Sequence, residues 1–104
     1  MLYSYDGWDQ INEVDYHISD DGVVFSNDKK VLVRYPAQRE DETYTVPEGI
    51  ESIGVLAFAN CDYLKEVVLP KGLLEISDNA FEECKGLTTI TIPKSTRKIG
   101  IYAF

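Results

Sequence analysis

The sequence has few of the residues that build catalytic and metal sites, and it has no long apolar run. Its 104 residues include one histidine, His17, and two cysteines, Cys61 and Cys84. No stretch approaches the roughly 18 apolar residues of a membrane-spanning helix. There is no glycine-rich phosphate loop, no serine–histidine–aspartate arrangement and no pair of histidines at metal-ligand spacing. These absences predict a protein that is not an enzyme, holds no cofactor or metal and does not insert into a membrane.

Basic residues are scarce as well. Ten Lys and Arg residues stand against eighteen Asp and Glu residues, so the net charge is −8. Nucleic-acid phosphates are repelled by such a balance, and no basic stripe with interleaved aromatics offsets it, so we expect no nucleic-acid partner. Residues 1–42 hold ten acids and four bases (net −6), whereas residues 43–104 hold eight acids and six bases (net −2). Any attraction for a basic partner therefore belongs to the first 42 residues, although an acidic balance more often only confers solubility.

An internal repeat of 23 residues is present in the second half of the chain. The same residue type recurs every 23 positions at several places, each of which is called a column below. Several such columns with one spacing are typical of a solenoid, in which each repeat forms one coil. The columns with this spacing are Pro47, Pro70 and Pro93; Phe58, Phe81 and Phe104; Ile53, Ile76 and Ile99; Ala57, Ala80 and Ala103; Cys61 and Cys84; and Leu64 and Leu87.

Each repeat joins a strand pattern to a turn pattern. Near the ends of residues 64–70 and 87–93, apolar and polar residues alternate as they do in a half-buried strand. Each of these segments ends at a proline, which has no N–H group to donate to the hydrogen bonds of a sheet. Residues 76–84 follow, where Ser77 or Asp78 is placed to cap a short helical turn. Such a coil cannot bury its apolar side alone, so neighbouring coils must stack. Equivalent side chains then lie about 4.8 Å apart, which predicts an interior ladder of the three repeat phenylalanines.

These columns resemble the BspA-like leucine-rich repeats of many bacterial surface proteins and some parasitic protists. The resemblance covers about residues 43–104 and implies an α/β repeat solenoid: a short right-handed leucine-rich-repeat stack with parallel strands and short helical turns. The residues that carry it are Ile53-Gly54, Ala57-Phe58, Cys61, Leu64 and Val67-Val68-Leu69-Pro70 in one cycle, Ile76, Ala80-Phe81, Cys84, Leu87 and Ile90-Thr91-Ile92-Pro93 in the next, and Ile99-Gly100 with Ala103-Phe104 in a third.

The same resemblance implies a cell-surface or secreted protein that attaches to or adheres to host proteins. The first residues, however, lack the basic and apolar segments of a signal peptide. A cytoplasmic location therefore stays open beside export by a signal encoded outside this sequence.

Residues 1–42 lack the repeat and are expected to form an N-terminal cap before the repeats of residues 43–104. Turn signals separate short runs rich in β-branched and aromatic residues, which predicts a β-meander with strands at about 16–18, 23–26 and 31–35. A similar strand pair is often inserted in the same family. A polar connector follows at residues 37–42. Further upstream, Leu2, Tyr5, Trp8 and Ile11 recur every three residues, which predicts a short helical or irregular cap over the apolar end of the stack.

The repeats comprise two full coils and a truncated third, because the chain stops at Phe104, on a core column and without a polar cap. Natural solenoids close that end. We therefore expect either a fragment of a longer array or self-association through the open end.

The two cysteines share one repeat position. Stacking would place their Cα atoms about 5 Å apart, within the range of a disulfide. The shared position nevertheless favours a ladder of buried free thiols, since free cysteine is among the most buried residue types. Without a nearby histidine, Cys61 and Cys84 do not make a zinc site.

The other titratable groups have ordinary explanations. His17 lies in a predicted strand and is expected to be structural rather than a base or a metal ligand. Asp20-Asp21 and Glu40-Asp41-Glu42 do not match the spaced oxygen ligands of a calcium loop, and no cleft for a glycosidase is indicated. We interpret both acidic groups as charged, solvated loops.

The exposed side of the strands is the candidate partner-binding face. If Val67 and Leu69 point inward, Glu66 and Val68 point outward, and the repeat adds threonines beside them. Solenoids commonly bind partners on such a face, although threonine is also simply a good exposed strand residue. The predicted face has two rows, Thr43, Glu66 and Thr89 beside Thr45, Val68 and Thr91.

Three non-enzymatic functions follow from the sequence. The leading hypothesis is a protein-binding or cell-surface adhesion module with an unidentified protein partner. The second is an intracellular acidic binding or inhibitory protein, of the immunity type, for a basic partner, supported by the negative charge of residues 1–42. The third is a structural repeat that spaces other domains of a longer polypeptide.

Overall fold

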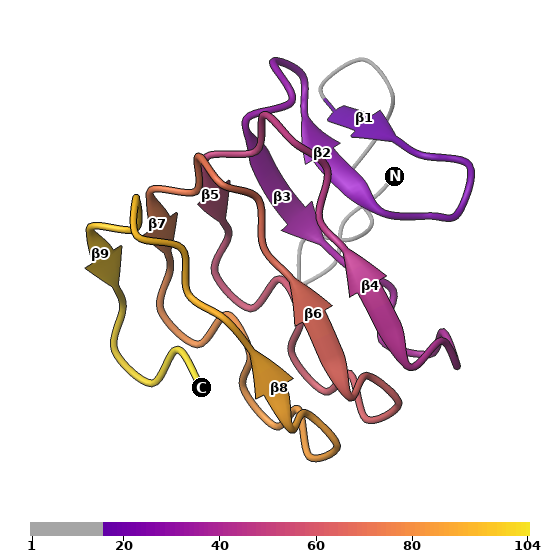
Figure 1. The fold of residues 1–104 in the computed structure, drawn as a ribbon. Helices are drawn as coiled ribbons and strands as arrows, with labels where there is room; N and C mark the ends of the chain where they lie inside the picture. The colour runs from indigo at the N-terminus through magenta and orange to yellow at the C-terminus, as the bar shows by residue number, and fades with distance from the viewer. Residues whose placement is uncertain (1–15) are drawn as a thin grey trace.

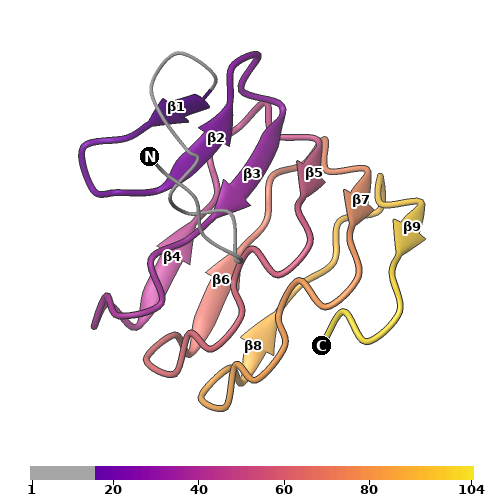
Figure 2. The same ribbon diagram turned by 180° about the vertical axis from the view of Figure 1, so that it is seen from behind.

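Nine short strands and their connecting turns make up the computed structural model, which describes residues 16–104 (Figure 1). They form two sheets, in the order β1-β2-β3-β5-β7-β9 and β4-β6-β8. Figures 1 and 2 show β5, β7 and β9 lined up along one side of the stack and β4, β6 and β8 along another. The strands are β1 (Tyr16–Ile18), β2 (Val24–Ser26), β3 (Val31–Arg34), β4 (Thr43–Thr45), β5 (Ser52–Ile53), β6 (Glu66–Val68), β7 (Glu75–Ile76), β8 (Thr89–Ile90) and β9 (Lys98–Ile99).

Each coil contributes one strand to each sheet. Parallel pairing of β4, β6 and β8 aligns Thr43 with Glu66 and Glu66 with Thr89. On the other side, β5, β7 and β9 align Ile53 with Ile76 and Ile76 with Ile99. The predicted stack of parallel strands is confirmed, but the second strand in each coil was not predicted. A two-residue strand is too short for an alternating pattern.

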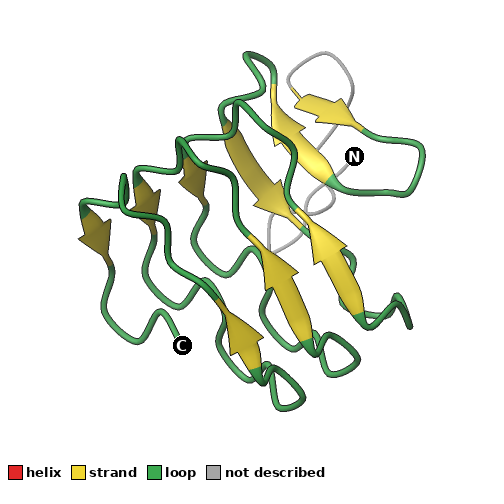
Figure 3. Cartoon of the chain, viewed as in Figure 1, coloured by secondary structure: helices red, strands yellow, loops and turns green. Residues whose placement is uncertain are grey.

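The predicted helical turns are wrong, because the described residues contain no helix (Figure 3). Left-handed backbone recurs at one repeat position, with φ near 60° at Leu56, Asn79 and Tyr102. A right-handed helical turn cannot include such residues. Alternate amides in this segment instead bond to the next coil, as the Phe58 amide donates to the Ala80 carbonyl at 2.7 Å. Stacking of coils therefore outcompetes the local helix.

The predicted β-meander is confirmed for β1, β2 and β3, which pair antiparallel. The last of these strands then pairs parallel with β5, where Leu32 aligns with Ile53. The meander is thus continuous with the sheet of the repeats, as Figure 1 shows. The cap predicted from Leu2, Tyr5, Trp8 and Ile11 lies outside the described residues.

The predicted aromatic ladder is present and is longer than expected. The rings of Phe58 and Phe81 stack at 4.8 Å between centroids with 5° between planes, and those of Phe81 and Phe104 at 5.2 Å with 3°. Tyr35 adds a fourth ring, 5.2 Å from Phe58. Its position, 23 residues before Phe58, was the overlooked signal. Tyr35, Phe58 and Phe81 are buried, whereas Phe104 is 55% exposed.

Candidate functional site

The β4-β6-β8 sheet places the predicted rows of the candidate face side by side. Val67 is 1% exposed and points into the core, so Val68 beside it points outward and is 41% exposed. The register puts Thr45 next to Val68, just as Thr43, Glu66 and Thr89 align. Thr91 follows the end of β8 and is also exposed. All six residues therefore lie on one side of the stack, and Glu66 alone among them is half-buried.

A shallow groove of about 350 Å³ crosses this face between the second and third coils. Apolar side chains dominate its walls, and a carboxylate and an ammonium group stand beside them. It is lined by Glu66, Val67, Val68, Leu69, Lys71, Thr91 and Pro93. Three of the six predicted face residues thus belong to a hollow that is able to receive an apolar side chain of a partner.

One ion pair lies beside the face. Lys65 lies 3.5 Å from Glu42, the residue that precedes β4. The Lys65 carbonyl accepts a hydrogen bond from the Thr88 hydroxyl. Such exposed ion pairs contribute little to stability. The two rows themselves are nearly uncharged, because Glu66 is the one charged residue among the six.

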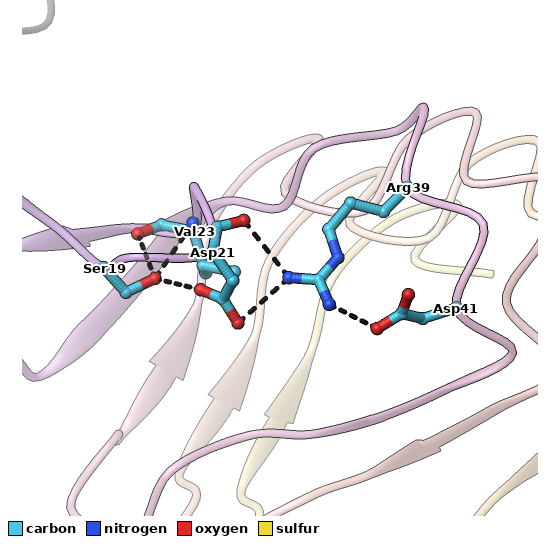
Figure 4. Close-up of polar contacts among 5 residues, drawn as sticks. All are labelled: Ser19, Asp21, Val23, Arg39 and Asp41. Atoms are coloured by element: carbon cyan, nitrogen blue, oxygen red, sulfur yellow. Dashed lines mark hydrogen bonds and ion pairs between the residues drawn. The ribbon is translucent and has the colours of Figure 1, made fainter.

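The acidic loops form ion pairs and turns. Figure 4 shows Arg39 between Asp21 and Asp41, with Ser19 bonded to Asp21. The Ser19 hydroxyl and the Arg39 guanidinium hold the pKa of the Asp21 carboxyl below its ordinary 3.8. Because Arg39 also lies over the Tyr35 ring, 5.6 Å from its centroid, this network joins the meander to the connector. Asp21, Asp41 and Glu42 of these loops thus have ion-pair partners within the fold.

His17 lies in β1 and is exposed, with its ring 6.4 Å from that of Phe25. It borders a hollow of about 250 Å³ whose other walls include Phe25, Lys29 and Ile50. Within residues 16–104, no group of three or more His, Cys, Asp or Glu side chains is placed to hold a metal ion. The same part of the chain contains no helix long and apolar enough to cross a membrane.

Cys61 and Cys84 are free thiols on adjacent coils. Cys61 is buried and Cys84 is half-buried, with its sulfur 2.8 Å from the Phe58 carbonyl oxygen. Contact with the Cys84 thiol, together with burial, raises the pKa of the Cys61 thiol well above its ordinary value. Cys61 is therefore protonated at neutral pH.

Apolar side chains are exposed at the C-terminal end of the stack. The exposed fractions are 50% for Ile99, 68% for Ile101, 78% for Tyr102 and 55% for Phe104. A hollow of about 250 Å³ lies there between the second and third coils, bordered by Phe81, Cys84, Leu87, Thr88, Thr89, Ile90 and Phe104. This end is thus the second surface, besides the candidate face, on which apolar groups gather.

Comparison with known proteins explains the repeat. A family described as "BspA type Leucine rich repeat region (6 copies)" matches residues 38–104. The chain belongs to this BspA-type leucine-rich repeat family. Proteins of this kind are generally non-enzymatic modules that bind other proteins or form surface repeats. A search among curated proteins found none that matches the sequence.

Solved structures of bacterial leucine-rich repeat proteins share the fold. The pneumococcal vaccine antigen PcpA is 28% identical, with a TM-score of 0.77 over 83% of this chain and 27% of that protein. A leucine-rich repeat protein from Eubacterium ventriosum is 28% identical, with a TM-score of 0.78 over 83% of this chain and 23% of its own. A leucine-rich repeat protein from T. pallidum has 23% identity and a TM-score of 0.60 over 86% of this chain and 53% of its own, which shows the fold alone. The BspA-type chain thus spans only about a quarter of the first two proteins.

Proposed function

We propose that this BspA-type chain is a non-enzymatic adhesion module whose β4-β6-β8 face binds a protein at a bacterial cell surface. The single observation that carries the proposal is the register of the face, which aligns two rows of exposed side chains over three coils. Thr43, Glu66 and Thr89 form one row, and the apolar hollow at Val68 interrupts the other. A regular surface with one apolar recess is suited to binding a partner.

The cell-surface location rests on the family and on the relatives. PcpA is described as a pneumococcal vaccine antigen, which supports a surface role for the fold that the two chains share. The nearly uncharged rows also support adhesion rather than electrostatic capture, because a single carboxylate, Glu66, gives little long-range attraction for a charged partner. The second candidate, an acidic protein for a basic partner, is favoured by one hollow of about 380 Å³ that Glu40 and Asp62 border.

A binding assay with charge-matched variants tests the proposal. Labelled chain is added to immobilised extracellular-matrix proteins, and wild type is compared with the face variant Glu66→Lys/Thr89→Arg. The control is Glu83→Lys/Gln38→Arg, which changes the net charge equally at exposed positions outside the face. We expect the face variant to lose at least about tenfold in affinity, or roughly 1.4 kcal/mol, and the control to bind as wild type. An equal loss of affinity in both variants would show that the partner binds outside this face. If the wild-type chain binds none of the matrix proteins, a spacer role would be favoured.

We also propose self-association through the C-terminal end, with a second copy of the chain as the occupant. Ile101, Tyr102 and Phe104 form the exposed apolar surface that such a contact would cover. Light scattering across a concentration series should show dimers that Tyr102→Lys abolishes. A wild-type chain that stays monomeric at high concentration would rule this contact out.

A further inference from the structure

Cys61 and Cys84 form a pair of thiols that the proposed binding face does not use. They occupy the same position of the 23-residue repeat in adjacent coils. Both are free, and the two thiols interact directly with each other. Their contact adds to the backbone hydrogen bonds between the two coils.

The backbones are in close contact on both sides of this pair. Before the cysteines, the Asn60 amide donates to the Glu82 carbonyl at 2.9 Å. After them, a Cβ atom built on Gly86 would lie only 2.7 Å from the Asp62 carbonyl oxygen. Backbones in such register are about 4.8 Å apart, and disulfides span Cα separations of roughly 4.4–6.8 Å. The fold therefore already holds the two cysteines at a separation that a disulfide requires.

Access to the pair is one-sided. Cys84 borders the hollow of about 250 Å³ at the C-terminal end of the stack, together with Leu87 and Thr88. Cys61 is only 1% exposed and is not among the residues that border this hollow. A reagent that enters from solvent therefore meets the Cys84 sulfur first.

We propose that Cys61 and Cys84 are a reversible disulfide site between coils, closed by exchange with a small-molecule disulfide such as glutathione disulfide. Cys84 loses its proton to solvent, and its thiolate attacks one sulfur of the reagent and displaces a glutathione thiolate. Cys61 then loses its proton and attacks the Cys84 sulfur, which breaks the mixed disulfide and releases the second glutathione thiolate. Two protein thiols are oxidised to one disulfide, and the reagent is reduced to two thiols that take up the two protons.

The bond would close a loop of 24 residues, from position 61 to position 84. Cross-linking a loop of this length restricts the unfolded chain, so the thermal midpoint of the oxidised protein should rise by roughly 10 °C. Reduction with dithiothreitol should return the midpoint to that of the thiol form. The pair would thus stiffen the joint between the first and second coils under oxidising conditions.

Mass spectrometry of the folded chain in glutathione redox buffers tests the site. After acid quench and alkylation, we expect oxidised wild type to lose the mass of two hydrogen atoms and to carry neither glutathione nor an alkyl group. Cys61→Ala should retain glutathione on Cys84, because the second attack is missing. Cys84→Ala should stay unmodified, since Cys61 is buried.

The products formed by the wild-type chain decide the test even if a variant fails to fold. Unreacted thiols in an oxidising buffer, stable glutathione adducts on wild type, or disulfide-linked dimers would each overturn the proposal. An internal disulfide that leaves the thermal midpoint unchanged would overturn the stiffening role.

Discussion

The aromatic ladder depends on individual residues that fill one repeat position. Tyr35, Phe58 and Phe81 are at most 1% exposed, so each ring is enclosed by rings or side chains of neighbouring coils. Burial of such a ring contributes about 2–3 kcal/mol by transfer from water. For a small domain this is a large share of the total stability.

Phe81→Ala is expected to lower the free energy of unfolding by about 3–5 kcal/mol, because it leaves a cavity between two stacked rings. Phe104→Ala is the matched control, since the Phe104 ring is 55% exposed and should contribute much less. Urea denaturation of both variants measures the difference. Equal losses in the two variants would contradict the burial argument.

Tyr35→Phe is expected to leave stability unchanged or to raise it by up to about 1 kcal/mol. The Tyr35 hydroxyl is buried and has no hydrogen-bond partner among residues 16–104. Removing an unpaired buried polar group relieves its desolvation cost and keeps the ring in the ladder. A clear loss of stability in thermal unfolding would show that the hydroxyl has a partner.

At the scale of elements, close contact between coils explains where glycine is required. A Cβ on Gly86 would come within 2.7 Å of the Asp62 carbonyl oxygen, whereas a Cβ on Gly72 would meet no atom within 4 Å. Gly86→Ala should therefore cost about 1–3 kcal/mol, because two backbones must move apart. Gly72→Ala should be nearly neutral. Denaturation curves that rank the two variants in the opposite order would contradict the observed packing of the coils.

The ion-pair network of the meander predicts a dependence on pH. The pKa of Asp21 is lowered, so its contribution is present above the ordinary value of 3.8 and is lost as the pH falls through the lower, folded value. The thermal midpoint of wild type should therefore fall more steeply between about pH 5 and pH 2 than that of Asp21→Asn. The difference should be small because the Asp21 side chain is 47% exposed. Parallel profiles would show that Asp21 does not contribute.

The elements differ in how far the sequence predicts them. The strands β4, β6 and β8 and the meander follow from alternation and turn residues, which are local signals. The strands β5, β7 and β9 each have only two residues, and they exist because the coils align. The turns contain Leu56, Asn79 and Tyr102 in left-handed backbone, a conformation that is uncommon for leucine and tyrosine. Stacking therefore determined the elements that local patterns could not indicate.

The candidate face, too, was predicted from the sequence only in part. Alternation around Val67 predicted which side chains are exposed, and the repeat predicted their alignment over three coils. The hollow beside Val68 depends on Lys71 and Pro93, which come from different coils and lie outside the strands. Its shape is set by tertiary packing and was not visible in the sequence.

For the whole molecule, the distribution of charge separates adhesion from electrostatic capture. The rows of the face carry one carboxylate, Glu66, whereas residues 1–42 carry a net charge of −6. Binding through the face should change by less than about threefold between roughly 50 and 500 mM NaCl, because few charges are screened. Capture by the acidic half should instead weaken strongly over that range. Affinity measured across the salt series would thus identify which half of the chain binds.

Methyl NMR provides the most direct test that the β4-β6-β8 face binds the partner. Val68 on the face is 41% exposed, and Val55, outside the face, is 58% exposed, so the two valines are matched reporters on one chain. On addition of the captured matrix protein, we predict that the Val68 methyl signals shift or broaden while those of Val55 do not change. Changes at Val55 with none at Val68 would contradict binding through this face.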